Sequence, residues 1–204
     1  MLAIIDYGLG NLGSIANMLK VIGEKSIITS DKEKIKKSDR IILPGVGAFD
    51  AGMKNLQDRD LCSFIQEEAM EGKPILGICL GMQLLGRKSE EGKRGGLGLI
   101  PFDNVRFQLP LECGLKIPHM GWDIVDFRQE NPLVYGIGME RQRYYFVHTF
   151  HAVCDNASEV LMTCDYGYEF AAAVSKGNIY GVQFHPEKSH EFGMRLLENF
   201  TKRC

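Results

Sequence analysis

The chain has 204 residues, of which 45% are hydrophobic and 25% are charged, and its formal net charge is −2. These proportions are ordinary for a folded globule, and they exclude a disordered protein and a basic surface for nucleic acid. No apolar stretch approaches the roughly 20 residues that a membrane helix needs, and the N-terminus has no basic segment of a secretory signal. We therefore expect a cytoplasmic protein with neither a membrane nor a nucleic-acid partner.

The first 90 residues alternate between short apolar strands and helices. Strands are predicted at Leu2–Asp6, Ser26–Thr29, Arg40–Leu43 and Pro74–Ile78. Helices are predicted from Ile15 to Ile22, after Ser30 or Asp31, over Leu61–Met70 and over Leu80–Leu85. Continuous apolar strands indicate a parallel sheet that helices cover on both faces. The predicted fold class is α/β, a flavodoxin-like three-layer sandwich with a mostly parallel central sheet.

The second half is richer in strand signals. Strands are predicted at Val105–Phe107, Trp122–Val125, Tyr144–Phe150, Glu159–Thr163, Phe170–Val174 and Ile179–Phe184, and a helix at His190–Phe200. We find no internal repeat, low-complexity tract or linker. Residues 1–204 are therefore expected to form a single domain.

One of the six cysteines has the surroundings of a nucleophile. The chain contains no C-x-x-C pair, and free thiols in a reducing compartment are expected. Cys79 lies in Gly77-Ile78-Cys79-Leu80-Gly81, between a predicted strand and a predicted helix, as in a G-x-S-x-G nucleophile elbow. Flanking glycines allow a strained turn, and the helix start favours a thiolate. The structural alternative is a buried cysteine in a glycine-flanked turn.

A candidate base and its orienting acid follow the last predicted strand. His185 stands at the end of that strand, where catalytic groups of α/β sheets gather, and Pro186 fixes the backbone after it. In an extended chain, positions i and i+2 point the same way, so Glu187 can hold one imidazole nitrogen while the other faces Cys79. A zinc site at His185, His190 and Glu191 fits no standard ligand spacing, and no metal is expected.

Two glycine-rich turns lie at the same edge of the predicted sheet. Pro44–Gly47 follows the third strand and leaves backbone N–H groups free to stabilise an oxyanion, although it also reads as an ordinary β-turn. Gly8–Gly13 matches the dinucleotide fingerprint G-x-G-x-x-G. Asp6 precedes those glycines, however, and its carboxylate would repel a pyrophosphate. Walker A is absent as well, so we expect no nucleotide and no other cofactor.

At these residues the chain closely resembles the class I (triad) glutamine amidotransferases. The likeness covers nearly the whole chain, at Ile4–Gly8, Pro44–Gly47, Gly77–Leu85, Pro118–Trp122, Tyr145–His148 and Gln183–Ser189. The cysteine elbow and the His-Pro-Glu segment are shared by all members. Pro118–Trp122 and Tyr145–His148 are more specific to glutaminase subunits that pass ammonia to a (β/α)8-barrel synthase subunit.

The resemblance implies a role for each segment. Cys79 would attack the carboxamide of glutamine, His185 would protonate the departing ammonia and then activate water, and Glu187 would orient His185. Gly47 and Leu80 would supply oxyanion-hole N–H groups, and the peptide at Val46 would flip for activity. The expected glutamine pocket comprises Gly45, Val46, Gln83, Glu91, His148, Thr149 and Phe150. The expected partner face comprises Asn11, Pro118, His119, Met120, Gly121, Trp122 and Lys188.

Several alternatives remain open at this stage. Gln83 would point to solvent if its helix were merely amphipathic, and a lone Trp122 is often a core residue. The segment Ser189–Met194 looks more like relatives that supply ammonia for aminated or amidinated sugars of surface polysaccharide than like those of histidine biosynthesis. A peptidase or deglycase with the same cysteine elbow, and a non-catalytic subunit that only holds a partner barrel, are the two competing functions.

Overall fold

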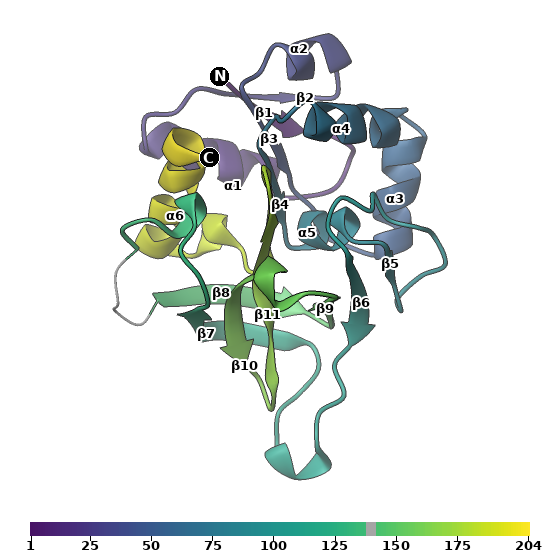
Figure 1. Ribbon diagram of the computed structural model, residues 1–204, viewed down its shortest axis with the longest axis vertical. Coiled ribbons are helices and arrows are strands. Elements are labelled where there is room, and N and C mark those ends of the chain that lie inside the picture. Colours follow the sequence, from purple (N-terminus) through teal and green to yellow (C-terminus); the bar gives the residue numbers. More distant parts are fainter. Residues whose placement is uncertain (138–141) are drawn as a thin grey trace.

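The structure, a computed structural model, describes residues 1–137 and 142–204 (Figure 1). Its central strands are β1 (Leu2–Ile5), β2 (Ser26–Thr29), β3 (Arg40–Leu43), β4 (Ile75–Ile78) and β12 (Ile179–Val182). They lie in the order β2-β1-β3-β4-β12, and every neighbouring pair is parallel. This order places the carboxyl ends of β4 and β12 side by side. Within the described ranges, no helix is long and apolar enough to cross a membrane.

Helices cover both faces of these strands, as the continuous apolar strands predict. They are α1 (Leu12–Val21), α2 (Lys32–Lys36), α3 (Phe49–Gln57), α4 (Leu61–Met70), α5 (Leu80–Leu85) and α6 (His190–Arg203). Figure 1 shows α1 and α6 on one side of the sheet and α3 and α4 on the other. Successive residues of a strand point to opposite faces: Ile4 packs in a core with α1 and α6, and Ile5 packs in a second core with α3 and α4.

Antiparallel strands extend the sheet beyond β12. They are β11 (Glu169–Lys176), β10 (Val160–Asp165), β7 (His119–Phe127) and β8 (Gln142–His148), in that order. A smaller branch consists of β9 (Phe150–Cys154), which pairs with β11 and β6 (Phe102–Arg106), and of β5 (Lys88–Ser89). Four 3-10 turns complete the described chain, at Leu111–Cys113, Pro132–Val134, Ala157–Glu159 and Pro186–Lys188. The predicted α/β class with mostly parallel central strands is confirmed, and the added strands make the whole sheet mixed.

Besides shifted strand ends, the structure differs from the prediction in one helix and one strand. Helix α3 was not predicted, although Phe49, Met53 and Leu56 are buried at helical spacing. The predicted strand Tyr144–Phe150 is interrupted at Thr149, and its two parts belong to β8 and β9. The interruption at Thr149 could not be predicted, because pairing between strands is not visible in local periodicity. Of the two N-cap candidates for α2, Ser30 and Asp31, the structure has Asp31, whose Oδ1 accepts a hydrogen bond from the backbone N–H of Glu33 (2.9 Å).

Candidate active site

Cys79 occupies a strained turn between β4 and α5. Its φ of 55° and ψ of −111° lie in a region that residues with a Cβ rarely adopt. The flanking glycines are required by close approach: a Cβ on Gly81 would lie 1.8 Å from the carbonyl oxygen of Leu43, and a Cβ on Gly77 would lie 2.6 Å from that of Gly81. The predicted strained, glycine-flanked turn is confirmed. Backbone strain of this kind persists only where the surrounding structure enforces it, and it is frequent at active sites.

His185 and Glu187 form a buried pair beside this turn. The backbone N–H of Cys79 donates to the carbonyl oxygen of Val182 at the end of β12 (2.8 Å), so the chain reaches His185 next to the elbow. His185 Nδ1 lies 2.8 Å from Glu187 Oε1, and the two side chains are 2% and 1% exposed. Glu187 belongs to the 3-10 turn Pro186–Lys188. The expected contact therefore forms, but through a turn and not through the extended chain that we assumed.

The surroundings of His185 favour its charged form. Its Nε2 is buried and makes no well-formed hydrogen bond within the described residues. Burial lowers the pKa of His185, but its interactions with the Cys79 sulfur and the Glu187 carboxylate outweigh burial and raise that pKa to about 9. This shift favours the imidazolium form of the ring at neutral pH. A proton held on Nε2 near a sulfur atom is the arrangement that an acid–base partner of a cysteine nucleophile needs.

The Pro44–Gly47 turn packs against the Cys79 turn. The hydroxyl of Tyr7 donates to the carbonyl oxygen of Pro44 (2.6 Å), and a Cβ on Gly45 would lie 2.8 Å from the Cβ of Leu80. Gly47 has a φ of 122°, which favours glycine, and the side chain of Val46 is exposed. The structure thus brings the two expected oxyanion segments, Pro44–Gly47 and Leu80, into contact.

The residues of the expected glutamine pocket come from several elements. Gln83 is buried, and its Nε2 donates to the carbonyl oxygen of Phe150 (3.1 Å), so the solvent-facing alternative is wrong. His148 Nδ1 also lies 2.8 Å from the Phe150 oxygen. Thr149 joins β8 to β9, and its carbonyl oxygen accepts from the N–H of Phe107 (3.1 Å). Gln83, His148 and Phe150 are therefore brought together.

Glu91, the remaining pocket candidate, follows β5, and its side chain contacts the first residue of α3. Its Oε2 accepts a hydrogen bond from the backbone N–H of Phe49 (2.8 Å). Phe49 follows the Pro44–Gly47 turn by two residues, so Glu91 holds the chain just after the expected oxyanion segment.

Two residues beside Cys79 were not assigned a role from the sequence. Gln183 is fully buried, its Nε2 lies 3.7 Å from the Cys79 sulfur, and its Oε1 accepts from Nε2 of Gln83 (3.1 Å). Burial, and then the charge on Cys79, raise the pKa of Tyr7 far above its usual value. Both residues stand at or just beyond strand ends that face the same edge of the sheet, which is the signal that would have found them.

The expected partner face is only partly exposed. Met120 is 61% exposed, whereas His119 is 1% exposed, because alternate residues of β7 point to opposite sides. The side chain of His119 therefore points into the protein and leaves that face to its neighbours on the strand. Trp122 stacks on His190 with ring centroids 5.3 Å apart, and Lys188 Nζ lies 5.4 Å from the centre of the Tyr145 ring. Asn11 is half-buried at the N-terminus of α1.

The Gly8–Gly13 turn packs against the Pro44–Gly47 turn. A Cβ on Gly10 would lie 3.1 Å from the Cβ of Pro44, and Asp6 Oδ1 accepts from the N–H of Gly8 (3.1 Å). The carboxylate that argued against a pyrophosphate therefore lies within the turn itself. These glycines serve the close contact of two turns at the sheet edge.

Comparison with known proteins identifies the family of this chain. Residues 3–204 match the family described as glutamine amidotransferase class-I. The chain is 52% identical to "Imidazole glycerol phosphate synthase subunit HisH 2" of Methanococcus maripaludis, with both chains fully covered. It is 47% identical to a protein of the same name from Pseudomonas aeruginosa, over 99% of each chain. "Imidazole glycerol phosphate synthase subunit HisH" of Sulfurimonas denitrificans is 50% identical over 99% of this chain and 98% of its own.

Solved structures share the fold at low sequence identity. One titled "Crystal structure of glutamine amidotransferase" is 16% identical, with a TM-score of 0.75 and 98% of both chains covered. "Structure of PurLQS from Thermotoga maritima" is 21% identical, with a TM-score of 0.73, and covers 98% of this chain and 96% of its own. The family match and the full-length relatives together place this chain in the class I glutamine amidotransferases.

Proposed function

We propose that the chain is the glutaminase subunit of imidazole glycerol phosphate synthase, with Cys79, His185 and Glu187 as its catalytic residues. It hydrolyses glutamine to glutamate and ammonia, and a (β/α)8-barrel subunit uses the ammonia to make imidazole glycerol phosphate and AICAR. The observation that carries the proposal is the strained Cys79 turn beside the buried His185–Glu187 pair. The names of the full-length relatives support the same acceptor.

The proposed reaction has two halves that share one base. The Cys79 thiolate attacks the carboxamide carbon, and the N–H groups of Leu80 and Gly47 stabilise the oxyanion that forms. His185 gives its Nε2 proton to the leaving nitrogen, so that ammonia departs and a thioester remains. His185 then takes a proton from water, and the resulting hydroxide attacks the thioester. Collapse of that intermediate releases glutamate and restores the thiolate.

The charge of His185 suits the first half of this reaction. With a pKa of about 9, the ring already carries the proton that ammonia needs in order to leave. Glu187 holds Nδ1 at 2.8 Å and so fixes the direction of Nε2. The exposed Val46 follows Gly45 in the oxyanion turn, where the peptide is proposed to reorient when the partner binds. The isolated subunit is therefore expected to be slow.

The proposed partner surface surrounds Trp122. Met120 is exposed, and Trp122 stacks on His190 beside the contact of Lys188 with Tyr145. Aromatic residues with an exposed edge are frequent anchors of protein interfaces. We place the barrel subunit here, in a cytoplasmic heterodimer with lyase activity, and assign the interface to Asn11, Pro118, Met120, Gly121, Trp122 and Lys188. Residues 1–204 are proposed to act as one glutaminase domain.

The test uses the complex with the cognate barrel subunit. Wild-type complex should form glutamate from glutamine, and Cys79→Ala should stop this while synthesis from added ammonia continues. Cys62→Ala, at a half-buried cysteine on α4, is the matched control and should behave as wild type. Glutamine-dependent synthesis by the Cys79→Ala complex would refute the catalytic assignment.

The acceptor needs a separate test. The named relatives favour histidine biosynthesis over the sugar-modifying alternative that Ser189–Met194 suggested. The chain and its barrel subunit should therefore restore growth without histidine to a strain that lacks the synthase. If a complex that releases glutamate normally does not restore growth, the chain is still a glutaminase, but its ammonia is used in the surface-polysaccharide pathway.

A further inference from the structure

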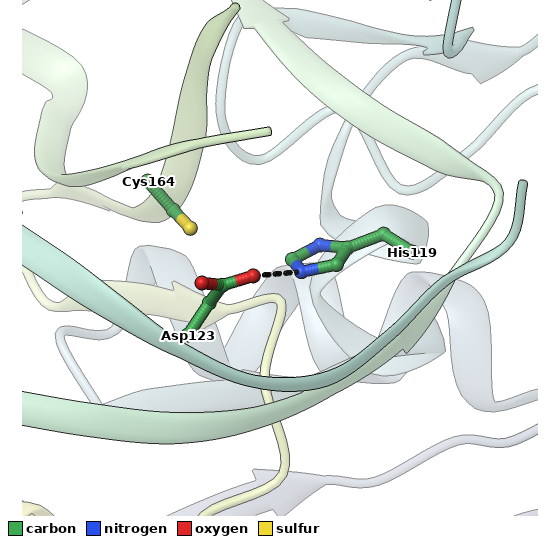
Figure 2. Close-up of side chains that lie close together, drawn as sticks. All are labelled: His119, Asp123 and Cys164. Atoms are coloured by element: carbon green, nitrogen blue, oxygen red, sulfur yellow. Dashed lines mark hydrogen bonds and ion pairs between the residues drawn. The ribbon is translucent and has the colours of Figure 1, made fainter. Parts of the chain in front are cut away.

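A cluster of three possible metal ligands lies between β7 and β10, away from Cys79. One ligand atom each from His119, Asp123 and Cys164 lies within 4.8 Å of the others (Figure 2). His119 and Cys164 are each 1% exposed, whereas the Asp123 side chain is 41% exposed. The imidazole, carboxylate and thiol groups converge in Figure 2. Of the three side chains, only that of Asp123 is open to solvent. From the sequence we expected no metal, and this set of residues was not among the candidate ligands.

The backbone of β7 and β10 brings these side chains to one face. Cys164 pairs with Val125 of β7, whose side chain shares a face with Asp123 and His119 at alternate positions. Gly121 lies between His119 and Asp123, with a φ of 141°. Apart from Gly121 and its two chain neighbours, no atom of the described residues lies within 4 Å of the place where a Cβ on Gly121 would stand. The positive φ of Gly121, which favours glycine, thus lies between two side chains four residues apart that meet.

The ring of His119 is held in place before any ion binds. Tyr166 stacks on one side with ring centroids 3.9 Å apart, and Phe146 stacks at 4.7 Å. His119 Nδ1 lies 3.0 Å from Nε2 of His148, whose own Nδ1 lies 2.8 Å from the Phe150 oxygen. A histidine ligand in proteins is usually oriented in this way through its second nitrogen.

A chain of polar contacts runs through His119, and two neutral imidazoles supply one proton fewer than these contacts need as hydrogen bonds. It runs from Asp123 through His119 and His148 to the Phe150 oxygen, and it contains three contacts. Each neutral imidazole has one N–H, and the carboxylate and the carbonyl have none. His148 needs its proton on Nδ1 to donate to Phe150, so His119 must donate from Nδ1. Nε2 of His119 and Oδ2 of Asp123 then face each other with lone pairs at 2.9 Å. A proton or a cation must lie between them.

We propose that His119, Asp123 and Cys164 bind a divalent transition-metal ion of the zinc class. A nitrogen, an oxygen and a sulfur donor suit Zn²⁺, which leaves a fourth position for water. The thiol of Cys164 loses its proton on binding, and the thiolate and the carboxylate together neutralise the ion. The contact between His119 and Asp123 lengthens as the ion enters through the exposed side of Asp123. The ion would join β7 to β10 and fix His148 in one orientation.

The experiment removes the competing ligand set first. Cys79→Ala protein is stripped of metal, because Cys79, His185 and Glu187 also offer a thiol, an imidazole and a carboxylate. It is then titrated with Co²⁺ and with Zn²⁺. We expect one equivalent of Co²⁺ to bind with a thiolate-to-cobalt charge-transfer band, and Zn²⁺ to raise the unfolding temperature.

Two ligand variants and one control decide the outcome. Cys164→Ser should abolish the cobalt band, and Asp123→Asn, at the half-exposed position, should weaken Zn²⁺ binding at least about tenfold. Asp126→Asn, three residues further along β7 and on its opposite face, should change neither. Absence of stoichiometric binding, or a band that survives in Cys164→Ser, would overturn the proposal and assign the His119–Asp123 contact to a shared proton. If Cys164→Ser does not fold, Asp123→Asn decides by itself: undiminished affinity there overturns the site.

Discussion

Two histidine–carboxylate pairs within residues 1–137 and 142–204 have nearly the same contact distance, but the pKa of the histidine is shifted in opposite directions in the two. His185 lies 2.8 Å from Glu187, and His119 lies 2.9 Å from Asp123. The pKa of His185 is raised to about 9, whereas burial lowers the pKa of His119 despite its carboxylate neighbour. Glu187 is 1% exposed and Asp123 is 41% exposed, so water screens the charge of the second carboxylate more than that of the first. Distance alone therefore does not decide whether such a pair is charged: the burial of the carboxylate and the neighbours of the imidazole matter as well.

The third member of each group adds to the difference. Cys79 contributes a sulfur that raises the pKa of His185. His119 instead contacts a second imidazole, His148, whose pKa burial lowers to about 3. One group is arranged to hold a proton at neutral pH, and the other has one proton fewer than its contacts require.

The largest effect should come from the proposed nucleophile. Cys79→Ser should lower kcat for glutamine hydrolysis in the complex by about 10⁴-fold or more, because a serine at this position is not ionised. Glutamate release measures it. Cys164→Ser, in the other group, should leave kcat within about tenfold of wild type. Equal losses in both variants would contradict the separation of the two groups.

The second-largest effect should come from the removal of one carboxylate charge, and it should differ between the two histidine–carboxylate pairs. Glu187→Gln should lower kcat by about 10²- to 10⁴-fold, less than Cys79→Ser, because nucleophile and base remain. The pKa of His185, about 9 in the wild type, should fall because the imidazolium loses a stabilising charge, so the alkaline limb of the pH–rate profile should move to lower pH. Asp123→Asn should leave that limb in place. A larger loss in Glu187→Gln than in Cys79→Ser would reverse the assigned roles.

A smaller effect is expected on the free energy of unfolding, which should fall at alkaline pH. The folded-state pKa of His185 is about 9 and its unfolded value is 6.5, so its contribution is fully present below 6.5 and is lost as pH rises through 9. The raised pKa corresponds to a loss on the order of 3 kcal/mol. Urea unfolding at intervals between pH 6 and 10 should therefore show a steeper fall for wild type than for His185→Gln. Parallel curves would mean that the ring is not charged in the folded protein.

The smallest effect concerns Gly121, which lies between the two members of the second pair, His119 and Asp123. Gly121→Ala has space for its Cβ, but its φ of 141° strains an alanine, so the free energy of unfolding should fall by about 1–2 kcal/mol. Gly13→Ala is the matched control, because it lies in α1 with nothing within 4 Å among the described residues. That variant should be neutral or stabilised by up to about 1 kcal/mol. Urea unfolding of both variants measures the difference.

Much of the parallel half follows from local patterns. The bounds of α4 and α5 agree with the prediction, and β2 and β3 do as well. The Cys79 turn could be predicted because a cysteine with glycines on both sides, between a strand and a helix, is the pattern of a nucleophile elbow. Helix α3 was missed, although its apolar spacing was present, because its start lies next to the glycine-rich turn that we read as a loop.

The elbow, the His-Pro-Glu segment and the family could be recognised from the amino-acid sequence, because each is carried by short motifs of neighbouring residues. Three contacts could not: Gln183 lies against Cys79, His119 points inward, and Cys164 meets Asp123 across β7 and β10. These contacts depend on strand order and register. Periodicity along one strand carries no information on which strand lies beside it, so side chains that meet across strands remain hidden until the sheet is assembled.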